Sequence, residues 1–242
     1  MKTFKVLSVL LSYPQADWIE HLDELENLLT EEKILSKQKL KGIGELFKRL
    51  RTDDLIQLQE SYVATFDRGA AHSLHLFEHI HGESRDRGQA MIDLMEMYNA
   101  NGLDVGTSDL PDCLPVFLEF LSTGNLAQAS HFLGETAKVL MLIRERLAKK
   151  DLDYKYIFAA LVEIADAKIN RKEIKKIVAA EKEEDSFESV DEEWAEPEAF
   201  GKNLFKSKDY LHQKIAMNIH SSNPHSQPNH PINQEKHIAQ EQ

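Results

Sequence analysis

The residues of this chain that are best suited to chemistry are four histidines at positions 72, 75, 79 and 81. Imidazole nitrogen is a good zinc ligand, and the i, i+3, i+7 spacing of His72, His75 and His79 would place them on one face of a helix. A small metal-dependent helical enzyme using the His72/His75/His79 cluster is therefore one interpretation. Because no thiolate or second ligand pair accompanies them, we favour histidines that hydrogen-bond and border a groove, and we expect no cofactor.

Other catalytic patterns have less support in the sequence. Glu78 stands three residues before His81, which is half of a carboxylate di-iron pattern, but there is no second Glu-x-x-His. Cys113 lies near apolar residues and Pro111, so we expect it to pack rather than to act as a thiolate. The sequence also holds no nucleophile elbow and no phosphate-binding loop. These observations predict a protein that is not an enzyme.

Residues 76–91 crowd charged and imidazole groups between two apolar helical patterns, which is typical of a recognition surface. Acidic and imidazole side chains beside Leu76, Phe77 and Ile80 would suit a peptide that carries both apolar and basic side chains. A second interpretation is that Ser84 or Asp86 caps the following helix while nearby arginines project into water. The two interpretations can hold together.

The elements that must position these residues are predicted to be helices, because apolar residues recur with helical spacing along most of the chain. Comparable alternation with a period of two is absent from the sequence, so an all-α fold is expected. Start and stop signals are Thr52-Asp53, Asn101-Gly102, and Asp112 and Gly124 on either side of a short helix. The expected apolar helical stretches are 4–11, 18–29, 40–50, 55–66, 91–98, 114–123, 126–147, 157–164 and 174–178.

Composition divides the chain into a single compact multi-helix bundle at 1–180 and a tail at 181–242. Between positions 181 and 198 the sequence holds ten acidic residues and a single basic residue, Lys182. This acidic segment and the His-rich end are therefore expected to be largely disordered. The net charge of −12 argues against nucleic acid as a partner. One cysteine, no export signal and no run of ~20 apolar residues predict a cytoplasmic protein without direct membrane insertion.

Three ordered blocks, 62–67, 76–91 and 110–121, resemble the NarJ family of respiratory nitrate reductase assembly chaperones. The family shares an all-helical bundle with the wider TorD and DmsD group of chaperones for molybdenum-containing redox enzymes. The resemblance implies a protein that binds the apo form of the catalytic (alpha) subunit of nitrate reductase, including its N-terminal segment. It also implies that binding enables molybdenum cofactor insertion and complex assembly before membrane docking.

On this interpretation the client lies in a groove formed near 76–89 and the 110–120 region, where Glu78 and Glu119 face its basic residues. The candidate client-peptide-binding residues are Tyr62, Asp67, Leu76, Phe77, Glu78, His79, His81, Glu83, Arg85, Asp86, Arg87, Gln89, Pro111, Asp112, Pro115 and Glu119.

Overall fold

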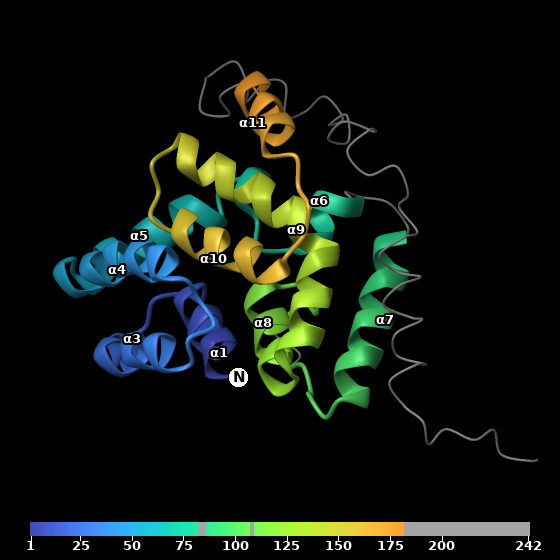
Figure 1. The fold of residues 1–242 in the computed structure, drawn as a ribbon, viewed down its shortest axis with the longest axis horizontal. Coiled ribbons are helices and arrows are strands. Elements are labelled where there is room, and N and C mark those ends of the chain that lie inside the picture. Colours follow the sequence, from blue (N-terminus) through green and yellow to red (C-terminus); the bar gives the residue numbers. More distant parts are fainter. Residues whose placement is uncertain (82–85, 107–108, 182–242) are drawn as a thin grey trace, which may run out of the picture.

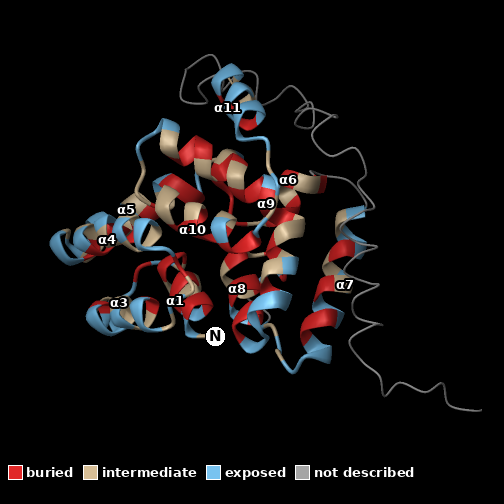
Figure 2. Ribbon diagram, viewed as in Figure 1, coloured by how far each residue is buried: buried red, intermediate tan, exposed pale blue. Residues whose placement is uncertain are grey.

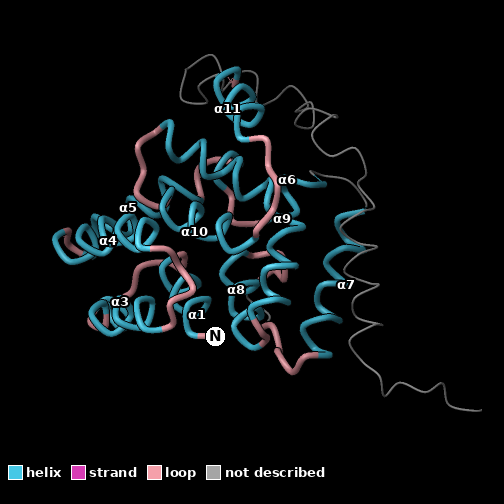
Figure 3. Tube along the Cα trace, viewed as in Figure 1, coloured by secondary structure: helices cyan, strands magenta, loops and turns pink. Residues whose placement is uncertain are grey.

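The computed structural model describes residues 1–81, 86–106 and 109–181 (Figure 1). Within these ranges the chain forms α helices and one short 3-10 helix, and it contains no strand (Figure 3). The prediction of an all-α fold is therefore confirmed. In chain order the helices are α1 (Lys2–Leu10), α2 (Ala16–Ile19), α3 (Leu22–Glu31), α4 (Lys37–Thr52), α5 (Leu55–Phe66), η1 (Ala70–His72), α6 (Leu76–His81), α7 (Asp86–Ala100), α8 (Leu114–Thr123), α9 (Leu126–Lys149), α10 (Lys155–Ala165) and α11 (Arg171–Ala180).

The long helix α9 is the centre of the bundle. It packs along α10 and carries α11 on its C-terminal half, while α1 packs on α8 and α3, and α4 packs on α3 and α10. Buried residues line the faces that the helices turn toward one another (Figure 2). On α9 and α10 the completely buried apolar residues are Leu133, Leu140, Ile143, Leu147, Ile157, Phe158, Ala160 and Leu161. Each buried side chain of leucine size stabilises the fold by about 1.5–3 kcal/mol, so this shared face is a major source of stability.

Helix α9 begins at a reciprocal cap. The Asn125 side chain accepts from the backbone amide of Gln128 at 3.0 Å, and the Gln128 side chain accepts from the Asn125 amide at 3.3 Å. Two of the amide groups that a helix start leaves unpaired are satisfied in this way. Together with Gly124, which ends α8, this cap separates α8 from α9 within two residues.

Some predicted boundaries are wrong and others are confirmed. The start signal at Thr52-Asp53 is not used, because α4 continues through Thr52 and the α5 cap is Asp54, whose carboxylate accepts from the Gln57 amide at 2.9 Å. The stretch 18–29 is divided between α2 and α3. The stop after α7 is confirmed, since Gly102 adopts a left-handed conformation with φ of 77°.

A glycine lets α4 approach α10 closely. A Cβ atom placed on Gly42 would lie 2.6 Å from a ring carbon of Tyr156, which is shorter than any normal contact. Gly44, half a turn further along α4, has more room, because the nearest atom to its Cβ would be a Glu26 oxygen at 3.9 Å. The close helix contact therefore depends on Gly42 specifically.

The last described helix is held by charge as well as by a small apolar cluster. Leu142, Ile174 and Val178 pack together between α9 and α11. Arg146, which is only 4% exposed, donates to both carboxylate oxygens of Glu181, at 2.7 and 3.0 Å. The expected tail beyond Glu181 lies outside the described residues. None of the described helices is both long and apolar enough to span a bilayer.

Candidate functional site

Two of the three sequence blocks that carry the family resemblance, 76–91 and 110–121, meet directly in the structure. The Leu76 amide donates to the carbonyl of Asp112 at 3.0 Å, and the Leu114 amide donates to the carbonyl of Leu74 at 2.9 Å. These bonds form a short antiparallel bridge that joins the start of α6 to the start of α8. The relative position of the two helices is therefore fixed by backbone hydrogen bonds.

Asp112 is completely buried and is the polar centre of this contact. Its carboxylate accepts from the Phe77 amide at 3.1 Å and lies 3.2 Å from the Nδ1 atom of His75. The expectation that Asp112 caps 114–123 is wrong, because the carboxylate instead caps the neighbouring helix α6. Helix α8 has Cys113 at its cap position, without a side-chain bond, and Pro115 in its first turn, where a missing amide costs little.

Arg87, in the first turn of α7, adds a third helix to the same contact. Its Nη2 atom lies 3.3 Å from a Glu78 oxygen and 3.8 Å from an Asp112 oxygen. The Arg87 side chain is 26% exposed and contacts these carboxylates, so the second interpretation, in which the nearby arginines project into water, does not describe Arg87. We call His75, Glu78, Arg87 and Asp112 the carboxylate junction, because two acidic groups share one guanidinium and one imidazole there.

The buried Asp112 carboxylate changes the pKa of the His75 imidazole. The hydrogen bond to Asp112 raises the pKa of His75, against the opposing effect of partial burial. When His75 is neutral, the junction holds two carboxylates and one guanidinium, so it retains one excess negative charge. A basic side chain brought to this surface would therefore meet a favourable field.

His72, His75 and His79 do not share one helix face as expected. His72 ends η1, His75 lies in the bridge before α6, and only His79 and His81 belong to α6 itself. Burial lowers the pKa of His79, whose Nε2 donates to the Ser73 carbonyl at 2.9 Å. His81 is buried edge-to-face against Phe77, with ring centroids 5.4 Å apart. In the described part of the chain no three histidine, cysteine or acidic residues form a group that would hold a metal.

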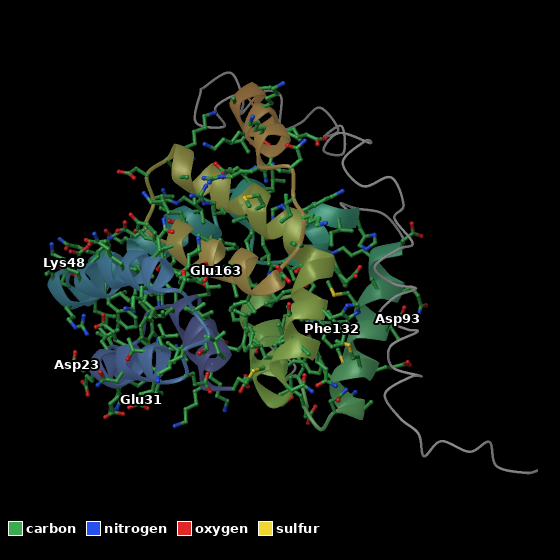
Figure 4. The ribbon with its side chains drawn as sticks, in the orientation of Figure 1. Asp23, Glu31, Lys48, Asp93, Phe132 and Glu163 are labelled. Carbon is green, nitrogen blue, oxygen red and sulfur yellow. The ribbon has the colours of Figure 1, made fainter. Side chains whose placement is uncertain are left out.

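Aromatic packing positions α7 against the rest of the bundle. Tyr98 is completely buried, and its hydroxyl donates to the Pro111 carbonyl at 2.8 Å. Its ring lies 5.0 Å from that of Phe120 on α8, which in turn lies 5.7 Å from Phe132 on α9. Figure 4 shows Phe132 on the part of α9 beside α7, and Asp93 on the opposite side of α7. The sequence pattern places Tyr98 in an apolar stripe but does not predict this contact, which depends on three helices meeting.

The first block, 62–67, does not contribute to the carboxylate junction. Its buried residues Tyr62 and Phe66 pack in the hydrophobic core beside the N-terminal helices. Tyr62 is buried, its hydroxyl donates to the Leu11 carbonyl at 2.9 Å, and burial raises its pKa well above the ordinary value. Its ring contacts Tyr13 and Phe66, with centroid distances of 5.6 and 5.0 Å. Asp67 is exposed at the end of α5.

The candidate residues differ widely in accessibility. Asp67, Asp86, Gln89 and Glu119 are exposed, and Glu78, Arg87 and Pro115 are half-buried. The buried members are Tyr62, Leu76, Phe77, His79, His81, Pro111 and Asp112. Glu83 and Arg85 lie outside the described residues. Apolar side chains that remain accessible near the junction's helices are Ile92 and Met95 on α7, and Leu110 before α8.

A separate open pocket of about 550 Å³ lies on the outer face of α5. The only sequence signal for it is Ile56, which falls outside the apolar stripe of its helix and is 68% exposed. The pocket is lined by Tyr13, Ile56, Gln59, Glu60, Val63, Ala64 and Arg68.

Comparison with known proteins agrees with the sequence resemblance. The family model described as the nitrate reductase delta subunit matches residues 16–160. The nitrate reductase molybdenum cofactor assembly chaperone NarJ of Escherichia coli K12 is 37% identical over 79% of this chain and 81% of its own length. The probable chaperone NarW of the same strain is 34% identical over 81% and 82% of the two chains. A probable NarJ of Bacillus subtilis is 29% identical over 66% of this chain and 86% of its own.

Proposed function

Because the chain belongs to the nitrate reductase delta subunit family, we propose that it is a cytoplasmic chaperone for assembly of the molybdenum cofactor into nitrate reductase. Its client is the apo form of the catalytic subunit, including the N-terminal segment of that subunit. The single observation that carries this proposal is the similarity to assembly chaperones over about four-fifths of both chains. The chaperone acts by binding and catalyses no reaction itself.

The carboxylate junction supports a surface for basic and apolar client residues. Glu78 is partly accessible, and Glu119 is exposed on α8, the helix that begins at the junction. Half-buried Ile80 and exposed Leu110 supply apolar surface on the same two segments. Burial of such side chains supplies affinity, whereas the acidic groups supply orientation and a faster encounter.

Chaperone action requires preference for one state of the client. A binding partner shifts a conformational equilibrium only by the difference between its affinities for the two states. The protein therefore binds the apo subunit more tightly than the mature subunit, keeps it competent for cofactor insertion, and releases it before membrane docking.

Calorimetric titration of the chaperone with apo and mature catalytic subunit tests the proposal. The apo subunit should bind more tightly, and the difference should persist when the proteins are purified by the same route. Equal affinity for the two forms would remove the mechanism, because binding would then favour neither state.

The double charge reversal Glu78→Lys with Glu119→Lys tests the surface. It should weaken binding of the subunit's N-terminal peptide, with the larger effect at low salt, where screening is weakest. The control is Glu20→Lys with Glu31→Lys, which alters two exposed acids near α3 and changes the net charge equally. An equal loss in both double variants would assign the effect to overall charge and not to the proposed surface.

A further inference from the structure

The geometry of the carboxylate junction points to Arg87 as a resident cation that a basic side chain of the client replaces. We propose that client binding exchanges the Arg87 guanidinium for a client arginine or lysine at Glu78. This inference rests on the proposed function and goes beyond it, because it names the group that competes with the client. It makes Arg87 a specificity-determining residue that competes with the basic group of the client for Glu78.

The contacts of Arg87 are weak for a guanidinium between two carboxylates. One nitrogen, Nη2, makes both contacts, at 3.3 Å to Glu78 and 3.8 Å to Asp112. Strong charge-assisted bonds are about 2.7–2.9 Å long, and arginine pairs most strongly through two nitrogens at once. Arg87 therefore occupies the site without using most of its binding capacity.

Arg146 shows what a tightly held guanidinium is like in the same molecule. It is 4% exposed and donates from two nitrogens to Glu181, at 2.7 and 3.0 Å, and from a third to the Ala71 carbonyl at 2.9 Å. Arg87, by contrast, is 26% exposed and has a single carboxylate within hydrogen-bonding distance among the described residues. Arg146 therefore has the contacts expected of a structural cation, and Arg87 has the longer and fewer contacts expected of a cation that can be exchanged.

The helix that carries Arg87 does not favour its position. Arg87 is the second residue of α7, and the N-terminus of a helix carries a partial positive charge that disfavours a nearby cation. Among the described residues, the ion pairs of its guanidinium are those with Glu78 and Asp112. Any group that offers Glu78 a better-aligned positive charge can take its place.

The buried carboxylate remains satisfied when Arg87 leaves. Asp112 keeps the Phe77 amide at 3.1 Å and His75 at 3.2 Å, whereas its contact with Arg87, at 3.8 Å, is longer than a hydrogen bond. Glu78, whose side chain is 33% exposed, is the carboxylate that would lose its partner. Release of Arg87 therefore opens one accessible negative site at Glu78, while the buried Asp112 carboxylate keeps both of its hydrogen bonds.

Titration with a synthetic peptide of the catalytic subunit's N-terminal segment tests the exchange. Arg87→Gln should bind this peptide roughly threefold to tenfold more tightly than the wild type, because no resident cation has to be displaced. A peptide with its arginine and lysine residues changed to glutamine should bind the two proteins equally. In the Glu78→Gln background, Arg87→Gln should bring no gain.

The control is Arg51→Gln, which removes a partly exposed arginine paired with Asp23 and Glu26 on α3 and should leave peptide affinity unchanged. Thermal unfolding of each variant establishes that it is folded at the titration temperature. Unchanged or weaker binding by Arg87→Gln, while the wild type binds well, would overturn the exchange and leave the chaperone proposal intact. Failure of both peptide and apo subunit to bind any folded form would overturn both proposals.

Discussion

Replacement of Asp112 by alanine should destabilise the protein more than any exposed acidic substitution. The carboxylate is completely buried and accepts the Phe77 amide in the first turn of α6. Without it, that amide is left without this acceptor, and the hydrogen bond to His75 is also lost. The change therefore removes the side-chain contact that links α6 to the segment before α8.

The expected magnitude follows from these two bonds. A buried amide that loses its acceptor costs about 1–3 kcal/mol. The His75 bond is half-exposed, so solvent screening limits its contribution to about 0.5–1 kcal/mol. We expect Asp112→Ala to lower the free energy of unfolding by about 1.5–4 kcal/mol. Asp112→Asn keeps an acceptor for the amide and should cost only about 1 kcal/mol.

Urea unfolding followed by circular dichroism measures these differences. The midpoint should fall while the slope stays constant, since the surface exposed on unfolding is unchanged. The matched control is Asp67→Ala at the exposed end of α5, which should lie within about 0.5 kcal/mol of the wild type. A loss below about 0.5 kcal/mol in Asp112→Ala would refute its role as the cap of α6.

Three further predictions concern packing, burial and charge. Gly42→Ala should lower the free energy of unfolding by about 1–3 kcal/mol, measured by thermal unfolding, because the added Cβ overlaps the Tyr156 ring on α10. The control Gly44→Ala should leave that free energy unchanged or raise it by up to about 1 kcal/mol. Equal effects of the two substitutions would contradict the close approach of α4 to α10. Burial lowers the pKa of His72 from its ordinary value of 6.5 to about 4. Between these two pH values the unfolded chain binds a proton that the folded chain does not. The free energy of unfolding should therefore be highest above pH 6.5 and fall by about 1.4 kcal/mol per pH unit toward pH 4. Denaturant titrations at pH 7 and pH 5 measure this fall, which should be smaller in His72→Gln than in the wild type. An equal fall in the two proteins would show that His72 is not the group responsible. Glu181→Ala should lower the free energy of unfolding by about 3 kcal/mol, more than Arg146→Met, because it removes the carboxylate that a buried guanidinium contacts through two nitrogens. Hydrogen exchange of the α11 amides reports the loss, and equal protection in both variants would exclude it.

Helices were predictable wherever local signals agreed. The range 114–123 matches α8 because apolar spacing, an early proline and a following glycine all act within a few residues. Gly102 stops α7 for the reason expected, since it adopts the left-handed conformation. The boundary at 52–53 was wrong because two adjacent acids, Asp53 and Asp54, offer equivalent caps, and the sequence does not distinguish them.

The carboxylate junction was less predictable because its contacts join segments far apart in the chain. Asp112 has a local cap role open to it, yet it bonds to Phe77, 35 residues away, once the backbone bridge brings α6 beside it. The same bridge holds His75 in extended backbone before α6 begins at Leu76, and it therefore separates His72 from His79. Residue types identified the right region, but which side chains pair depends on how the helices pack.

The ion pair between Arg146 and Glu181 limits where the chain can be shortened without loss of stability. Glu181 is the first residue of the stretch that holds ten acids between positions 181 and 198, and it is the member of that stretch that the structure describes as fastened to the bundle. A truncation after Ala180 would remove the carboxylate that the buried Arg146 guanidinium contacts through two nitrogens, whereas one a few residues later would keep it. Expression designs that trim the negative tail should therefore retain this carboxylate and place the new terminus beyond it.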